Sequence, residues 1–147
     1  MSEQSNRELI VRHFDEIFNR GNLAFVEEAY TENAIIHDAI LPNVPAGPGG
    51  IRRYVRTYGE PVPDIHFEVQ ELIADGDTMA AQWIASGTQV GTLLGLPSTG
   101  RRVEASGVSV YHMEEGRIAE AWVYWDVIAL LKSLGVEFKL KPIEAHA

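Results

Sequence analysis

The stretch VEASGVSVYHMEEGRIAEAWVYWD, residues 103–126, decides the fold. Two alternating runs flank a Glu-Glu-Gly sequence at 114–116, and a glycine after two acidic residues suits a type I turn closed by a left-handed residue. We therefore predict a β-hairpin with a three-residue loop between Met113 and Arg117. The pleat then gives one face that combines large apolar groups with ionisable ones: Ser106, Val108, Val110, His112, Ile118, Glu120, Trp122, Tyr124 and Asp126.

The opposite face of this hairpin is mostly small or apolar. Its members are Ala105, Gly107, Ser109, Tyr111, Ala119, Ala121, Val123 and Trp125. Neither face has the composition of an ordinary wet surface, so we expect both to be covered. One side would line an enclosed space, and the other would meet a second sheet or subunit.

Composition limits the class of protein. At 147 residues, the chain has the size of one domain that can bury a core. It has no cysteine, which excludes a disulfide framework and a thiolate zinc site. Twelve basic against 21 acidic residues give a net charge of -9, which argues against nucleic acid and anionic membrane as partners. No apolar run approaches the ~20 residues of a membrane helix, so we expect a soluble, cytoplasmic protein.

The rest of the chain divides into helices first and strands afterwards. Ser5 and Glu8 form a capping-box pattern at the start of an amphipathic helix that Gly21 ends. The later elements expected are a short helix from Asn22, a strand at 31–40, a loop at 41–50, a helix from Ile51 to Tyr58, a hairpin at 65–85, a loop at 91–100, a last helix at 127–134 and a tail at 136–147. This order predicts an α+β fold, a curved antiparallel sheet with helices packed across its concave side. A sheet curved around helices in this way has the shape of a cone, and we expect it to enclose a pocket.

Three segments carry a resemblance to a known family. They are IIHDA at 35–39, GTLLGLPSTGRRV at 91–103 and EEGRIAEAWVYWDVIALLKSLG at 114–135. The chain resembles the SnoaL-like polyketide cyclases of the nuclear transport factor 2-like superfamily, to which ketosteroid isomerase and limonene epoxide hydrolase also belong. The resemblance runs from the first helix to about Gly135. It implies a single cone-shaped domain over residues 1–147, with 136–147 as a C-terminal tail.

The resemblance also implies a reaction and its residues. Characterised enzymes of this family close a polyketide ring by an aldol reaction, without metal or cofactor. Their acid/base aspartate ends the last strand and corresponds to Asp126, with a histidine on the preceding strand that aligns with His112. Asp38 resembles the base of ketosteroid isomerase in position. Such a reaction needs a base, an acid and a dry pocket that holds the substrate folded.

Each of these residues also has a purely structural interpretation. Asp126 directly precedes the last helix and would make a good N-cap. Asp38 could serve turn chemistry before Pro42, and His112 could sit at the rim of the hairpin end. His37 should point away from Asp38 and Ile36, as a surface or interface histidine.

The expected ligand is a small hydrophobic molecule held by a largely apolar wall. The wall residues that we predict are Trp83, Trp122, Tyr124, Ile36 and Val108. No pair of histidines has metal-ligand spacing and no phosphate loop is present, so neither a metal nor a cofactor is indicated. The open alternatives are isomerisation or epoxide hydrolysis in the same pocket, and a non-catalytic domain that binds a ligand or a partner. We expect a homodimer formed through the outer face of the sheet.

Overall fold

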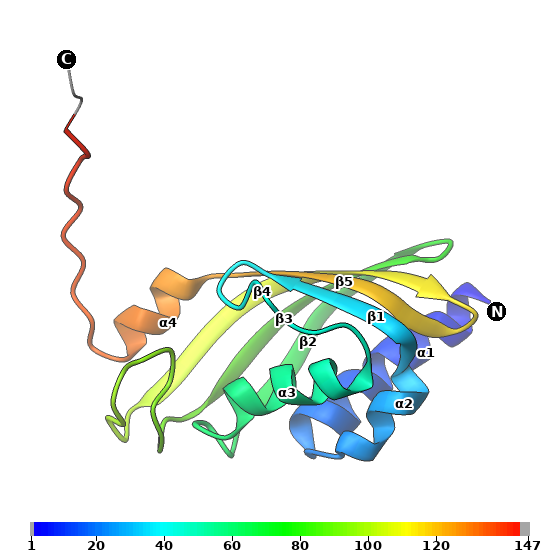
Figure 1. Cartoon of the computed structure of the whole chain (residues 1–147), viewed down its shortest axis with the longest axis horizontal. Coiled ribbons are helices and arrows are strands. Elements are labelled where there is room, and N and C mark those ends of the chain that lie inside the picture. Colours follow the sequence, from blue (N-terminus) through cyan, green and yellow to red (C-terminus); the bar gives the residue numbers. More distant parts are fainter. Residues whose placement is uncertain (1, 145–147) are drawn as a thin grey trace.

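The computed structural model describes residues 2–144 as a curved, unclosed sheet that wraps around helices (Figure 1). No helix in this described part is long and apolar enough to cross a membrane. The elements are α1 (Glu3–His13), a π-helix η1 (Phe14–Asn19), a 3-10 helix η2 (Leu23–Phe25), α2 (Val26–Ala29), β1 (Tyr30–Asp38), α3 (Pro48–Gly59), β2 (His66–Asp75), β3 (Thr78–Thr88), β4 (Arg102–Glu114), β5 (Arg117–Trp125) and α4 (Val127–Ser133).

The sheet has the strand order β1-β5-β4-β3-β2. Neighbours from β2 to β5 are antiparallel, whereas β1 runs parallel to β5, so the sheet is mixed at one edge. The helices α1, α2 and α3 lie on one side of the sheet, within its curve (Figure 1). The predicted α+β class with helices on the concave side is confirmed.

The first helix begins earlier than its sequence pattern suggested. Its N-cap is Ser2, whose hydroxyl accepts a hydrogen bond from the Ser5 amide at 3.0 Å. Ser5 is therefore not the cap, and the helix begins at Glu3. Its apolar face continues through η1, where Ile17 is fully buried like Ile10 before it. This face anchors the helix to the sheet.

The hairpin of β4 and β5 closes through a two-residue turn instead of the predicted three-residue loop. Glu114 pairs with Arg117, and the two residues between them have φ values of +49° and +79°, as a type I′ turn requires. This shift alone would turn every side chain of β5 to the other face. An irregularity in the pairing of β5 after Ile118 restores the alternation. Ile118 is therefore fully buried, on the opposite face from the predicted one.

The two faces of this hairpin have the residues that the alternation predicts from Glu120 onward, but their roles are exchanged. The side with Tyr111, Ala121, Val123 and Trp125 faces the helices and the interior. The side with Trp122 and Tyr124 is the outer face, and Tyr124 is 62% exposed there. The mixed face of large apolar and ionisable groups is thus the convex one.

Two apolar clusters fill the concave side. The larger lies between α1, α3 and the sheet, and the smaller lies at the α4 end of the sheet around Val62, Leu93, Val103, Leu130 and Leu134. After Gly135 the chain leaves the body as an extended tail (Figure 1), in which Leu140 and Ile143 are 94% and 96% exposed.

Candidate functional site

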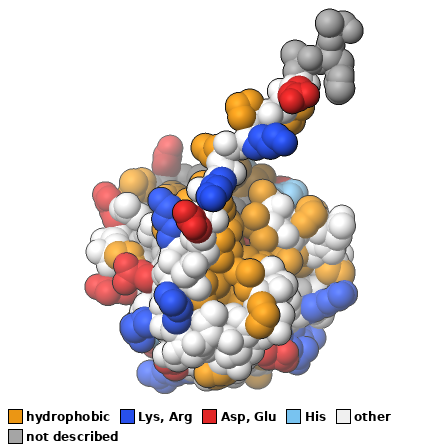
Figure 2. Space-filling view, turned by 90° about the vertical axis from the view of Figure 1, so that its left-hand side faces the viewer, with side chains coloured by type: hydrophobic (Ala, Val, Ile, Leu, Met, Phe, Trp, Pro, Cys, Tyr) orange, Lys and Arg blue, Asp and Glu red, His pale blue; other side chains and the backbone are white. Residues whose placement is uncertain are grey.

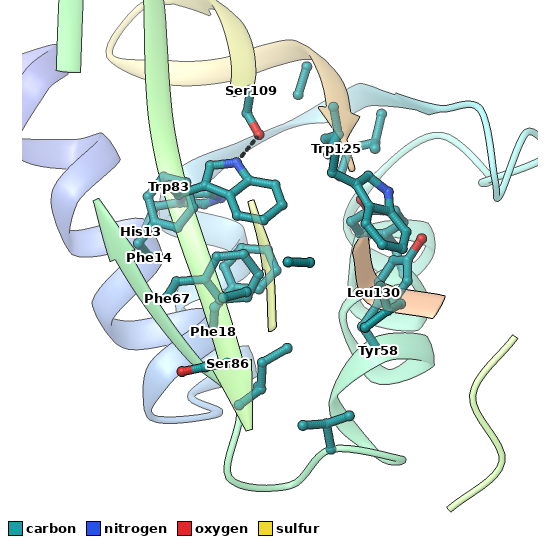
Figure 3. Close-up of a pocket in the computed structure, with 18 of the residues that line it drawn as sticks. His13, Phe14, Phe18, Tyr58, Phe67, Trp83, Ser86, Ser109, Trp125 and Leu130 are labelled. Carbon is teal, nitrogen blue, oxygen red and sulfur yellow. Dashed lines mark hydrogen bonds between the residues drawn. The ribbon is translucent and has the colours of Figure 1, made fainter. Parts of the chain in front are cut away.

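A cavity of about 90 Å³ lies between the concave face of the sheet and the helices. In the close-up of Figure 3, Phe14, Phe67 and Trp83 lie on one side and Tyr58, Trp125 and Leu130 on the other. Figure 2 shows hydrophobic side chains gathered in a hollow at the end of the molecule that faces the viewer, below the departing tail. The full lining is His13, Phe14, Phe18, Tyr30, Ile36, Tyr54, Tyr58, Val62, Ile65, Phe67, Trp83, Ala85, Ser86, Leu93, Val103, Ala105, Ser109, Tyr111, Ala121, Val123, Trp125 and Leu130.

One carboxyl group is hydrogen-bonded to residues of this apolar lining. Asp38, the last residue of β1, is 2% exposed. Its Oδ2 accepts hydrogen bonds from the hydroxyls of Tyr54 at 2.8 Å and Tyr58 at 2.9 Å. Its Oδ1 accepts from the Ile40 amide at 3.0 Å and, more weakly, from the Trp125 indole Nε1 at 3.4 Å. A buried carboxylate needs such donors, because desolvation without them would be prohibitive.

Local structure explains how these donors meet. Tyr54 and Tyr58 are four residues apart on α3, so they share one face of the helix and point the same way. β1 pairs with β5 so that Asp38 lies opposite Val123, two residues before Trp125. The ends of the two strands therefore bring the carboxylate and the indole together beneath the two phenols.

The phenols remain protonated donors. Burial, and next the negative charge of Asp38, raise the pKa of Tyr54 well above its usual value. The same two causes, in the same order, raise the pKa of the half-buried Tyr58. A proton held this firmly stays on the hydroxyl at neutral pH, so both tyrosines act as donors to the Asp38 side chain.

A second polar group faces the cavity from α1. His13 is 1% exposed, and its Nε2 lies 2.6 Å from the Tyr30 hydroxyl. Burial lowers the pKa of His13 to about 3, against a smaller opposing effect of the Ile10 carbonyl. The imidazole is therefore neutral under ordinary conditions. Nearby, the Trp83 Nε1 donates to the Ser109 hydroxyl at 2.9 Å, which leaves Trp83 no free polar atom.

Three of the residues predicted from sequence belong to this site. Ile36 and Trp83 line the cavity, and Asp38 is bonded to three of its lining side chains. The sequence analysis did not identify the tyrosines of α3 or His13 as site residues, because they lie among the apolar side chains of their helices. The four-residue spacing of Tyr54 and Tyr58 was the available signal, since it places two hydroxyls on one apolar stripe, where each needs a hydrogen-bond partner.

The predicted residue Asp126 lies outside the cavity lining. Its side chain is exposed and accepts a hydrogen bond from the Ala129 amide at 2.9 Å, the geometry of an N-cap for α4. Its carboxylate and that of Asp38 therefore do not face one cavity.

The other four predicted residues lie on the outer face of the sheet. The His112 ring centroid is 4.6 Å from that of Trp122, which also stacks on His37 at 5.3 Å. His37 Nε2 contacts a carboxylate oxygen of Glu120 at 2.6 Å. Val108 and Tyr124 are 39% and 62% exposed on the same face. His37 is thus a surface histidine, as expected.

Comparisons with known proteins agree with the fold and the sequence pattern. A comparison with curated proteins found no match. Among solved structures, TsrD from Streptomyces laurentii is 26% identical with a TM-score of 0.83, over 92% of this chain and 98% of that one. IdmH from Streptomyces antibioticus is 29% identical with a TM-score of 0.76, over 89% and 99%.

A SnoaL-like polyketide cyclase from Agrobacterium tumefaciens has the same fold, with 23% identity and a TM-score of 0.77 over 92% of this chain and 100% of that one. The family model of the SnoaL-like polyketide cyclases matches residues 8–134, which include every strand and every cavity-lining side chain. The chain therefore belongs to the SnoaL-like polyketide cyclase family.

Proposed function

We propose that the protein is an acid/base enzyme that acts on a small hydrophobic carbonyl compound, with ring closure of the aldol type as its reaction. One observation carries the proposal. The buried carboxylate of Asp38 is bonded to the side chains of Tyr54, Tyr58 and Trp125, all of which line an otherwise apolar cavity. Asp38 is not itself a lining residue, so a substrate must reach its carboxylate between these three side chains. A base that borders a dry cavity is what enolisation of a ketone requires.

Asp38 can both remove and return the one proton that the reaction moves. Its carboxylate takes a proton from the carbon next to a carbonyl, and the electron pair of that C–H bond forms an enolate. The enolate carbon attacks a second carbonyl, so one C–C bond forms and the π electrons move to oxygen. The resulting alkoxide takes back the proton, either directly or through the Tyr58 hydroxyl, which bonds to Oδ2 and faces the cavity.

The two carboxylate oxygens differ in their suitability as the base. Oδ2 holds two short bonds from phenols, whereas Oδ1 has one short bond from an amide and a long one of 3.4 Å from Trp125. Hydrogen bonds to the charged form stabilise it and weaken its basicity. The less firmly held Oδ1 is therefore the oxygen that we assign to proton abstraction, on the side of the Trp125 indole.

The size of the cavity restricts the substrate. Its volume of about 90 Å³ is smaller than the about 150 Å³ of a protein cavity that holds benzene. The enclosed space therefore suits a short-chain compound, and even a single ring must extend toward the mouth. A polycyclic substrate would require the aromatic walls to move apart.

The test is α-proton exchange, because it requires the base but not the full reaction. Open-chain ketones and monocyclic ketones such as cyclohexanone are incubated with the protein in D2O, and deuterium uptake is followed by NMR. We expect Asp38→Asn to lower the exchange rate by about 100-fold or more. The variant should fold, because an Asn oxygen can accept from Ile40 and Trp125 while its NH2 group donates to the two phenol oxygens.

Asp126→Asn is the matched control, because asparagine caps a helix about as well as aspartate. It should leave exchange at the wild-type rate. If Asp126→Asn abolishes exchange and Asp38→Asn does not, the base is the family-aligned aspartate and our assignment is wrong.

A non-catalytic ligand-binding domain is the second candidate. It is favoured by the complete set of donors on Asp38, which also describes a carboxylate that only fastens α3 to the end of β1. This role predicts that the protein binds small ketones without any exchange above the solvent rate. Isomerisation shares the first proton step and differs in where the proton returns. Epoxide hydrolysis is less well supported, because no arginine is among the described hydrogen-bond partners of Asp38.

We also propose that the outer face of the sheet forms a homodimer. Support comes from the exposed apolar side chains there, including Ile35, Val108 and Tyr124 at 40%, 39% and 62% exposure. Such a patch rarely stays open to water. Sedimentation equilibrium should give a dimer for the wild type and a monomer for Tyr124→Glu, and a monomeric wild type would rule this out.

A further inference from the structure

The loop between β3 and β4, residues 89–101, borders the cavity at the α4 end. Its Leu93 is 3% exposed, lines the cavity and belongs to the apolar cluster that contains Leu130. The loop therefore contributes a wall of the cavity at the same end where the hydrophobic hollow is seen in Figure 2. Whatever fixes this loop also fixes the boundary between the cavity and solvent.

One buried side chain holds the loop together from within. Gln89 is 0% exposed. Its Nε2 donates to the carbonyl oxygens of Gly91, Leu96 and Pro97 at 3.0, 3.1 and 3.1 Å. Its Oε1 accepts from the amide and the hydroxyl of Thr99 at 3.2 and 2.7 Å. Both arms of the loop thus converge on a single amide group.

The loop adds to this a tight turn and an anchor. Leu93 and Leu96 exchange amide-to-carbonyl bonds of 3.0 and 2.9 Å around Leu94 and Gly95, both with positive φ. The Val90 amide bonds to the Pro61 carbonyl at 2.8 Å, which ties the loop to the segment after α3. Leu94 is a non-glycine residue at φ +50°, a conformation that persists only when its surroundings hold it.

We propose that Gln89 is a positioning residue that keeps the 89–101 loop folded against the cavity, so that Leu93 stays in the cavity wall and ligand entry rises when the loop opens there. Gln89 is not among the residues that line the cavity and acts through the loop carbonyls and Thr99. This inference depends on the proposed function only for the identity of the ligand, a small carbonyl compound.

The test needs no turnover, so its outcome is independent of the chemistry at Asp38. It uses Gln89→Met, which keeps the length of the side chain and removes its hydrogen bonds, in a Trp122→Phe background. The two remaining tryptophans, Trp83 and Trp125, both line the cavity. Acrylamide quenching of their fluorescence then reports how often a small solute reaches the interior, and hydrogen exchange of the Leu93 and Leu96 amides reports loop opening.

We expect Gln89→Met to raise exchange at both amides by about tenfold or more, because the carbonyls of Gly91 and Pro97 lose the Gln89 donor while Thr99 loses its acceptor. The quenching constant should rise severalfold with it. Asn6→Ala is the control for a general loss of stability. Asn6 is also a buried amide, 1% exposed, but it bonds to Asp77 in the turn between β2 and β3.

Two outcomes would overturn the proposal. In the first, Asn6→Ala raises quenching and loop exchange as much as Gln89→Met does at an equal loss of melting temperature. In the second, the wild-type amides of Leu93 and Leu96 exchange as fast as those of an unstructured chain. That second measurement needs no variant and stands even if Gln89→Met fails to fold.

Discussion

Lowering the pH should destabilise this protein through one histidine. Burial lowers the pKa of His13 to about 3, from an ordinary value of 6.5 in the unfolded chain. Between these values the unfolded state binds a proton that the folded state does not, so stability falls as the pH falls below 6.5. Above 6.5 the contribution is fully present. Each pH unit costs about 1.4 kcal/mol, so pH 4.5 should cost about 2.5 kcal/mol relative to pH 7.

The substitution that removes this dependence is His13→Gln. Glutamine has no ionisable group and can still hydrogen-bond to the Tyr30 hydroxyl, which otherwise loses its partner at 2.6 Å. The aromatic rings around His13 are unchanged by the substitution. Those of Phe14 and Phe18 have centroids 4.9 and 5.2 Å from the imidazole centroid. We therefore expect a modest loss of stability at pH 7 and a much flatter pH profile.

The assay is urea unfolding of both proteins at pH 7.0, 5.5 and 4.5. Carboxylates that titrate at low pH affect both proteins equally, so the difference between the two profiles isolates His13. The free energy of unfolding of the wild type, relative to that of His13→Gln, should fall by about 2.5 kcal/mol on going from pH 7.0 to 4.5. Two parallel profiles would refute the argument that the imidazole is buried and neutral.

Three further substitutions test packing next to the cavity, a hydrogen bond of the site and the N-cap of α4. Gly107→Ala would place a methyl group 2.5 Å from an indole ring atom and should cost about 1–3 kcal/mol in urea unfolding, whereas Gly49→Ala meets nothing within 4 Å and should not destabilise. Tyr54→Phe removes a donor from Asp38 and should lower the free energy of unfolding by about 1–3 kcal/mol. A double-mutant cycle with Asp38→Asn should assign most of this loss to the interaction between the two side chains. Asp126→Ala should lower the melting temperature by an amount equivalent to about 1 kcal/mol through loss of the cap, and an unchanged value would show that α4 does not depend on it.

The sequence predicts the architecture well because periodicity reports burial directly. The alternation in β1 places Ile36 and Asp38 inside and His37 outside, as the structure has them. The change from helical to two-residue periodicity along the chain gives the α+β class. These patterns arise from local geometry, which one sequence contains in full.

The sequence does not show which face of the central hairpin is the inner one. Both faces are rich in apolar residues, because one borders the cavity and the other is an exposed apolar surface with Trp122 and Tyr124. Composition therefore favours neither, and the ionisable groups misleadingly suggested that the outer face was catalytic. The choice is made by α1 and α3, which pack on the side of Trp125 through contacts distant in sequence.

The site partners were hidden for a related reason. Tyr54 and Tyr58 sit on the apolar stripe of α3, and each looks like an ordinary core residue when taken alone. Their role depends on Asp38, which lies 16 and 20 residues earlier, at the end of β1 where that strand pairs with β5. A site assembled from three elements leaves only one local pattern in the sequence, the four-residue spacing of the two tyrosines.

The two phenols on Asp38 have a consequence for selectivity. In the resting protein they already occupy the lone pairs that an incoming molecule would seek. A guest that brings its own hydroxyl or enol can take the place of one phenol and leave every acceptor satisfied. A hydrocarbon of the same shape that displaced one phenol would leave a carboxylate oxygen of Asp38 without that hydrogen bond. The resting arrangement therefore favours molecules that carry a hydroxyl or enol donor over pure hydrocarbons, before any reaction begins.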